Sequence, residues 1–186
     1  AALLCLLLPS ACGEKPEPTP LEDLPEDYSL EQAKEDGCLV TEDGIVTSGR
    51  ESWEDFLKAS EAGKTASVRL CSYYTLDDPS RYDPDYYESI KDDYTLLFLK
   101  DLSYDGERFT AVSYEEGQRY EQSFSLLRRS EETVQATGVK IVRYMITDDA
   151  ETPPERIYAQ LYSSTLLPGK GIPFAAVYQE FIPPEE

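Results

Sequence analysis

The sequence has 186 residues and contains no histidine. Without an imidazole, neither a Ser-His-Asp triad nor a Cys-His pair can form, and zinc sites lose their commonest nitrogen ligand. The sequence also lacks the Gly-x-x-x-x-Gly-Lys-Ser/Thr pattern of a phosphate-binding loop. These absences exclude triad hydrolases and Cys-His enzymes, and they leave nucleotide binding by a P-loop without support.

Basic residues are scarce, because 17 Lys and Arg stand against 37 Asp and Glu, for a formal net charge of −20. A surface of this sign repels phosphate backbones and anionic lipid head groups. The sequence therefore argues against nucleic acid as a partner. The simplest interpretation of the acidity is a well-solvated surface on an exported protein.

Long hydrophobic runs are absent apart from a short apolar stretch at the start. Residues 1–11 are uncharged and end in Ser10 and Ala11 before Cys12, a pattern typical of the end of a lipoprotein signal peptide. The stretch is shorter than the roughly 20 residues of a membrane-spanning helix. We therefore expect residues 1–11 to be a truncated signal peptide and Cys12 to carry a lipid. Pro9 stands where such signals usually have leucine, so a secretion signal cleaved nearby and a chance apolar terminus are the alternatives.

Proline and acidic residues dominate residues 12–27. Alternating prolines favour an extended, semi-rigid backbone, so we interpret this segment as a tether without packed structure. Residues 28–186, about 160 in number, suit a single domain with its own core. Cys38 and Cys71 are the cysteines of this part. Without the spacing of a disulfide framework we expect buried free thiols, and a disulfide between the two, which an exported protein permits, is the alternative.

Short helices are expected where capping residues precede an amphipathic pattern. Ser29 and Gln32 have the form of a capping box, which predicts a helix ending at Gly37. Ser48 and Glu51 repeat this pattern before a second helix. The apolar face of that helix consists of Trp53, Phe56, Leu57 and Ser60. Two further helical segments are predicted at residues 84–90 and 157–162, each preceded by a proline that favours the first helical turn.

Strand patterns dominate the middle of the sequence. Runs rich in β-branched, aromatic and aliphatic residues lie at 95–104, 108–114 and 119–127. Asp105-Gly106 and Glu116-Gly117 join them, which predicts an antiparallel meander of three strands because Gly accepts the positive φ of hairpin turns. Further strands are expected at residues 66–75, 139–146 and 174–182. Since helices and strands do not alternate strictly, we expect an α+β fold with an antiparallel sheet and two or three short helices.

Several of these segments carry a resemblance to a known family. They are residues 28–37 (YSLEQAKEDG), the helix around Trp53 and Phe56, residues 67–69 (SVR) and residues 101–106 (DLSYDG). Over residues 28–129 the chain resembles small Gram-positive lipoproteins that share a domain of unknown function. The resemblance implies an exported, membrane-tethered α+β domain, and it carries over no catalytic residue.

Tyrosine is unusually abundant, with 14 residues. Tyr73 and Tyr74, and then Tyr86 and Tyr87, flank an acidic loop. Because tyrosine joins an apolar ring to a polar tip, it serves binding surfaces well. We identify these four side chains as a candidate ligand-binding face, although tyrosines that merely cover the solvent side of a sheet give the same pattern.

Since the chain has no histidine, its Asp and Glu side chains are the candidates for general acid-base catalysis. Asp83, Asp85 and Glu88 are hard oxygen ligands on one loop and form a candidate calcium site. Grouped acids could also serve a glycan hydrolase, which needs two carboxyl groups across a cleft. The groups are Asp77 with Asp78, Asp83 with Asp85 and Glu88, Asp92 with Asp93, and Asp148 with Asp149. In so acidic a chain, solvated surface residues produce the same clusters.

These observations lead to an expected function that is not enzymatic. We expect a domain at the outer face of the cell membrane, attached through a lipid on Cys12, that uses no cofactor and binds an envelope protein or a small envelope ligand. The alternatives are a carboxylate-dependent hydrolase of cell-wall glycan and a calcium-binding surface module.

Replacing Cys12 by alanine in the full-length gene tests the anchor. Lipid is attached to the cysteine sulfur, so the Cys12→Ala protein should leave the membrane fraction and appear in the medium or in soluble extracts. Immunoblots of cell fractions measure this, with Cys5→Ala as the matched control, which should stay at the membrane. A membrane-bound Cys12→Ala protein contradicts lipidation at this position.

Overall fold

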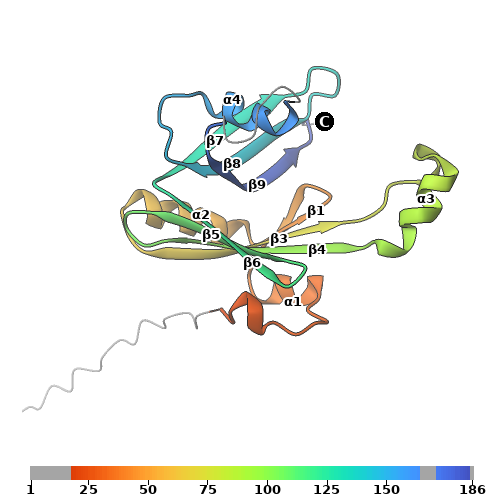
Figure 1. Cartoon of the computed structure of the whole chain (residues 1–186), viewed down its shortest axis with the longest axis horizontal. Coiled ribbons are helices and arrows are strands. Elements are labelled where there is room, and N and C mark those ends of the chain that lie inside the picture. Colours follow the sequence, from red (N-terminus) through yellow and green to blue (C-terminus); the bar gives the residue numbers. More distant parts are fainter. Residues whose placement is uncertain (1–17, 164–170, 185–186) are drawn as a thin grey trace, which may run out of the picture.

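A computed structural model describes residues 18–163 and 171–184 of the chain. These residues form an α+β fold with two sheets, which confirms the predicted fold class (Figure 1). Sheet A has the strand order β2-β1-β3-β4-β5-β6, and sheet B has the order β7-β8-β9. The strands of sheet A are β1 (Leu39–Glu42), β2 (Ile45–Ser48), β3 (Ala66–Tyr74), β4 (Leu96–Tyr104), β5 (Phe109–Glu115) and β6 (Gln118–Phe124). Those of sheet B are β7 (Leu126–Thr133), β8 (Lys140–Thr147) and β9 (Phe174–Ile182).

The helices are short and lie between the strands. They are α1 (Leu30–Glu35), α2 (Arg50–Glu61), α3 (Pro84–Ile90) and α4 (Pro154–Tyr158), with the 3-10 turns η1 (Leu21–Asp23), η2 (Pro79–Arg81), η3 (Lys91–Asp93) and η4 (Ala159–Tyr162). Within the described ranges, no helix is long and apolar enough to cross a membrane.

The first predicted helix and the meander have the expected local geometry. At α1, Ser29 N donates to Gln32 Oε1 at 2.7 Å and Gln32 N donates to Ser29 Oγ at 3.2 Å, which completes the capping box. Strands β4, β5 and β6 pair antiparallel. Glu116 and Gly117 both have positive φ, as a two-residue hairpin turn with matching twist requires.

The start of α2 differs from its predicted form. Gly49, rather than Ser48, occupies the N-cap position with φ +70, and no side chain caps this end. A Cβ atom on Gly49 would lie 1.8 Å from the Cys38 carbonyl oxygen. The close approach of two backbone segments therefore determines the start of the helix, and the predicted capping box at Ser48 and Glu51 is wrong.

Sheet A is mixed and not wholly antiparallel as predicted. Strand β1 pairs parallel with β3, with Leu39 opposite Leu70. The β1–β2 hairpin returns the chain to the start of β1, so the strand that follows α2 can run beside β1 in the same direction. Such a pairing joins segments 31 residues apart, as the register shows, and no local pattern encodes it.

The main core lies where α2 and sheet B cover one face of sheet A (Figure 1). Trp53 of α2 is 2% exposed, and its ring lies 4.9 Å from Tyr144 and 5.2 Å from Tyr178, measured between centroids. Both tyrosines belong to sheet B. Arg50 Nη2 also donates to Glu180 Oε2 at 2.6 Å, so α2 holds β9 through apolar and ionic contacts at once.

Packed structure begins before Tyr28, the expected start of the domain. Thr19 and η1 lie on the other face of sheet A and form an N-terminal strap. The Arg69 side chain is 5% exposed, and its two nitrogens donate to the Asp101 carboxylate at 2.7 and 2.8 Å. Arg69 Nη2 also donates to the Thr19 carbonyl at 2.6 Å. Because a buried guanidinium needs all its donors satisfied, this contact holds the strap against the sheet.

Cys38 and Cys71 are buried free thiols, which confirms the expectation. Cys71 lies opposite Val40 in the parallel pair, two residues from Cys38. Strand spacing then puts the two Cα atoms about 8 Å apart, beyond the reach of a disulfide. Burial raises the pKa of Cys38 and raises that of Cys71 to about 12, so neither thiol ionises readily.

Alanine substitutions at Gly49 and Gly63 should show how much stability depends on the close backbone approach at Gly49, beyond the cost of a positive φ. Gly63 has a similar φ of +67, but a Cβ atom there meets nothing within 4 Å. We expect Gly63→Ala to lower the free energy of unfolding by about 1–2 kcal/mol. Gly49→Ala should cost more than about 4 kcal/mol because backbone must also move. Urea unfolding measures both, and equal losses would contradict the role assigned to Gly49.

Candidate functional site

Two adjoining cavities lie between sheet A and β9. Their volumes are about 420 and about 340 Å³. Both linings include Lys100, Ser113, Glu115 and Ala176, so the two cavities form one continuous depression, which we call the inter-sheet groove. Its size falls in the range of small-molecule sites.

The floor of the inter-sheet groove is one face of sheet A. Side chains two residues apart on a strand point to the same face, and the register aligns Leu70 with Lys100 and Lys100 with Ser113. The floor residues, from β3 to β6, are Leu70, Ser72, Tyr74, Phe98, Lys100, Ala111, Ser113, Glu115, Tyr120 and Gln122. The floor therefore combines aromatic rings with hydroxyl, amide, carboxyl and ammonium groups.

Three aromatic side chains stand exposed on this floor. Tyr74 is 43% exposed, Phe98 50% and Tyr120 47%. The rings of Tyr74 and Phe98 meet edge to face, with centroids 5.9 Å apart. A soluble protein gains nothing in stability from apolar rings left in water, and aromatic side chains with polar neighbours are the usual lining of a binding site.

The wall of the inter-sheet groove is β9 together with α4. Gln179 and Tyr178 of β9 and Tyr158 of α4 line the larger cavity. Arg143 holds two of these side chains, because its Nε donates to Gln179 Oε1 at 2.9 Å and its guanidinium lies 4.9 Å from the Tyr158 ring centroid. At the end of this wall, Phe181 N donates to the Gly44 carbonyl at 2.7 Å. The wall is thus fixed to its surroundings at several points.

Lys100 lies at the junction of the two cavities. Its Nζ donates to the Ala176 carbonyl across the inter-sheet groove at 2.6 Å. Burial lowers the pKa of Lys100, and the negative charge of Glu115 opposes that change. The groove therefore holds a half-buried cation between aromatic rings.

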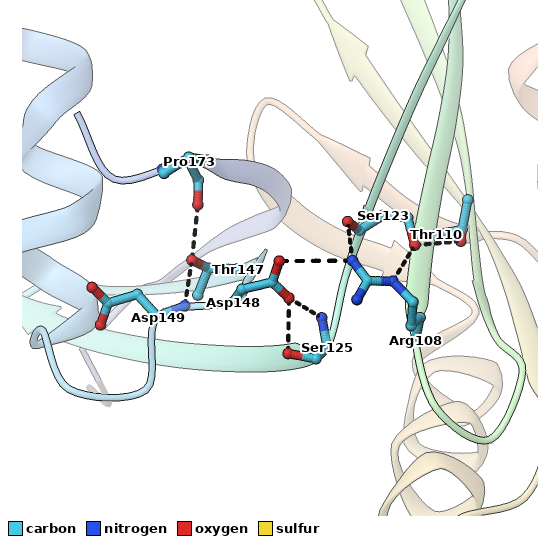
Figure 2. Close-up of polar contacts among 8 residues, drawn as sticks. All are labelled: Arg108, Thr110, Ser123, Ser125, Thr147, Asp148, Asp149 and Pro173. Carbon is cyan, nitrogen blue, oxygen red and sulfur yellow. Dashed lines mark hydrogen bonds and ion pairs between the residues drawn. The ribbon is translucent and has the colours of Figure 1, made fainter. Parts of the chain in front are cut away.

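A polar junction sets the position of sheet B on sheet A (Figure 2). Ser125 is the single residue between β6 and β7. Its N and Oγ both donate to Asp148 Oδ1 at 2.8 Å. Arg108 contacts the second oxygen of the same carboxylate. Its Nη2 donates to the Ser123 carbonyl at 2.7 Å and lies 3.7 Å from Asp148 Oδ2. The junction keeps the two sheets together at one end, while the inter-sheet groove opens elsewhere between them.

Three of the carboxylates considered for glycan hydrolysis, Asp78, Asp148 and Asp149, are used in local structure. Asp148 serves the junction, and Asp149 accepts from the backbone of Thr152 at 2.7 Å. Backbone donors at these sites lower the pKa of both aspartates, and a hydrogen bond from Ser80 lowers that of Asp78. A general acid needs the opposite shift. The geometry gives no support to a carboxylate enzyme at these groups.

The four candidate tyrosines do not form one surface. Tyr74 lies in the inter-sheet groove, whereas strand alternation puts Tyr73 on the opposite face of sheet A. Tyr86 and Tyr87 lie on α3, at the far end of the long connection between β3 and β4 (Figure 1). Their rings contact Tyr82, at 6.3 and 5.8 Å between centroids. Of the four, Tyr74 is the one that reaches the groove.

Two of the three candidate calcium ligands, Asp83 and Glu88, have other roles. Asp83 caps α3, accepting from Asp85 N at 3.0 Å, and Glu88 pairs with Lys91 at 2.8 Å. In the part of the chain that the structure describes, no three acidic or cysteine side chains gather closely enough to hold a metal ion. Cys12, the predicted lipid site, lies outside the described residues.

Sequence reasoning missed Phe98, Lys100 and Tyr120. The strand patterns at residues 95–104 and 119–127 predict the strands that carry them, but they assign none of these three side chains to a binding face. Nothing local indicated that sheet B would leave this part of the face open. The groove depends on the contact between Lys100 of β4 and Ala176 of β9. These two strands are distant in sequence, so no local pattern indicates the contact.

Comparisons with protein-family models, with curated proteins and with solved structures found no match for this chain. The resemblance to Gram-positive lipoproteins therefore rests on the residue patterns alone.

Replacing Asp148 by asparagine should remove part of the acid sensitivity of folding. A carboxyl group whose pKa is lowered by folding stabilises the protein above its unfolded pKa of about 3.9, and this contribution is lost as the pH falls through the folded pKa. The midpoint of thermal unfolding should therefore be lower for Asp148→Asn than for the wild type at pH 7, and this difference should shrink below about pH 4.

Asp92→Asn is the matched control, because Asp92 is exposed and accepts no hydrogen bond within the described residues. It corrects for the charge repulsion that any Asp→Asn change relieves in so acidic a chain. Parallel pH profiles for the two variants would contradict the role assigned to Asp148.

Proposed function

We propose that this protein is a non-enzymatic binding protein of the cell envelope, anchored by a lipid on Cys12, that takes a small ring-bearing ligand in the inter-sheet groove. The observation that carries the proposal is that the rings of Tyr74, Phe98 and Tyr120 are exposed on the groove floor. The groove volume favours a small ligand over a folded protein partner.

The mixed lining favours a ligand with both apolar faces and polar groups. Aromatic rings accept the apolar face of a flat or chair-shaped ring, while Gln122, Gln179 and Ser113 offer donors and acceptors at the edges. Sugars of the cell wall combine these properties. Binding without turnover is favoured because Glu115 is the one carboxylate in the described lining, whereas a glycan hydrolase needs two carboxyl groups across its cleft.

The position of the N-terminal strap supports a defined orientation of the folded domain relative to the membrane. Arg69 and Asp101 hold Thr19 on the face of sheet A opposite the floor of the inter-sheet groove. The six peptide links between Cys12 and Pro18 span at most about 21 Å. A lipid on Cys12 would therefore keep the strapped face nearest the membrane and leave the groove facing the wall.

Titration of the mature protein with soluble fragments of peptidoglycan tests the binding function. Phe98→Ala should weaken binding about tenfold, which corresponds to about 1.4 kcal/mol, because it removes one exposed ring of the groove floor. Calorimetry or the shift of the unfolding midpoint measures the effect.

Tyr86→Ala is the matched control, since Tyr86 is an equally exposed ring, at 57%, that lies on α3 away from the groove. It should bind like the wild type. Equal affinities for all three proteins, or release of cleaved glycan during the titration, would overturn the proposed function.

A further inference from the structure

Lys100 places an ammonium group in the linings of both cavities. Its Nζ has one hydrogen-bond partner among the described residues, the Ala176 carbonyl at 2.6 Å, and no carboxylate there forms an ion pair with it. An ammonium group carries three N–H donors. Donors therefore remain for a ligand that enters the inter-sheet groove.

A half-buried cation without a counter-ion is unfavourable for stability. Removing an ammonium group from water costs free energy that only a close negative charge or good hydrogen bonds recover. Methionine has a side chain of similar length and would fill the same space beside Ala176 without this cost. Lys100 therefore contributes something other than packing.

We infer that the inter-sheet groove recognises a ring-bearing carboxylate, with the carboxylate paired to Lys100 Nζ and the ring lying on the exposed aromatic side chains. This inference rests on the proposed function, since it assumes that the groove is the ligand site. Charge complementarity selects the occupant, because no described carboxylate lies within ion-pair distance of Lys100 Nζ and a ligand carboxylate can take that position.

Glu115 further restricts the chemical class of ligand that the inter-sheet groove can bind. It lines both cavities and adds a negative charge, so the lining of Lys100 and Glu115 is neutral in sum. A doubly charged phosphate would bring more negative charge near Glu115 than Lys100 offsets. A single carboxylate can pair with Lys100 if a hydroxyl or amide of the same ligand donates to Glu115. Acidic sugars with hydroxyl and amide groups have this combination.

A pair of amino sugars provides the test, because N-acetylmuramic acid is N-acetylglucosamine with an added carboxylate side chain. The wild-type protein should bind the acidic sugar at least about fivefold more tightly than the neutral one, as measured by NMR titration at pH 7. Lys100→Met should reduce this ratio to about one, because it weakens the binding of the acidic sugar more than that of the neutral one. Lys100→Arg keeps the positive charge and should retain the preference.

A second measurement needs only the wild-type chain, in case Lys100→Met does not fold. The acidic sugar should shift the backbone amide signals of Ser113 and Ala176, which lie beside Lys100, more strongly than the neutral sugar does. Equal affinities of the wild type for the two sugars, no binding of either, or shifts confined to other parts of the chain would overturn the inference. If peptidoglycan fragments still bind the wild type and bind Phe98→Ala more weakly, the proposed function stands even though this inference fails.

Discussion

The packing of Trp53 between the two sheets is the contact on which the rest of the structure depends. One ring of α2 touches Phe56 on its own helix and Tyr144 and Tyr178 of sheet B. Each aromatic pair contributes about 0.5–1.5 kcal/mol beyond the area it buries. Arg50 and Glu180 reinforce this contact with a short ion pair. Ile146, Ala175 and Val177 of sheet B join the same core cluster, and the polar junction at Ser125 adds a further connection to sheet A.

The same packing explains why a groove exists. Sheet B and α2 cover the part of sheet A that carries Val68, Leu102 and Phe109, and these side chains belong to the core. Strands β3 to β6 continue past that covered part, so the floor at Phe98 and Tyr120 meets β9 only at its margin. The other face of sheet A is covered by α1 and by the N-terminal strap (Figure 1). Because sheet B and α2 cover only part of one face of sheet A, the aromatic floor of the inter-sheet groove stays open there.

The local elements were predictable where a short segment contains its own reason for folding. The capping box at Ser29 and the turn at Glu116-Gly117 each depend on contacts within a few residues, and both have the expected geometry. The start of α2 was not predictable, because Gly49 is required by the distant backbone of Cys38. The strap was missed for a similar reason, since only the buried guanidinium of Arg69 explains why Thr19 packs against a sheet.

Composition and local patterns were enough to predict the α+β fold class and to exclude histidine chemistry, and they led us to expect a lipid anchor at Cys12 and no nucleic-acid partner. Each of these follows from composition or from contacts between near neighbours. The tertiary structure alone decided that Tyr74 belongs to a groove and that Tyr73, Tyr86 and Tyr87 do not. It also revealed Phe98, Lys100 and Tyr120. The physical reason is that a groove is a relation between surfaces distant in sequence, and alternation along one strand cannot say which part of a face another sheet will cover.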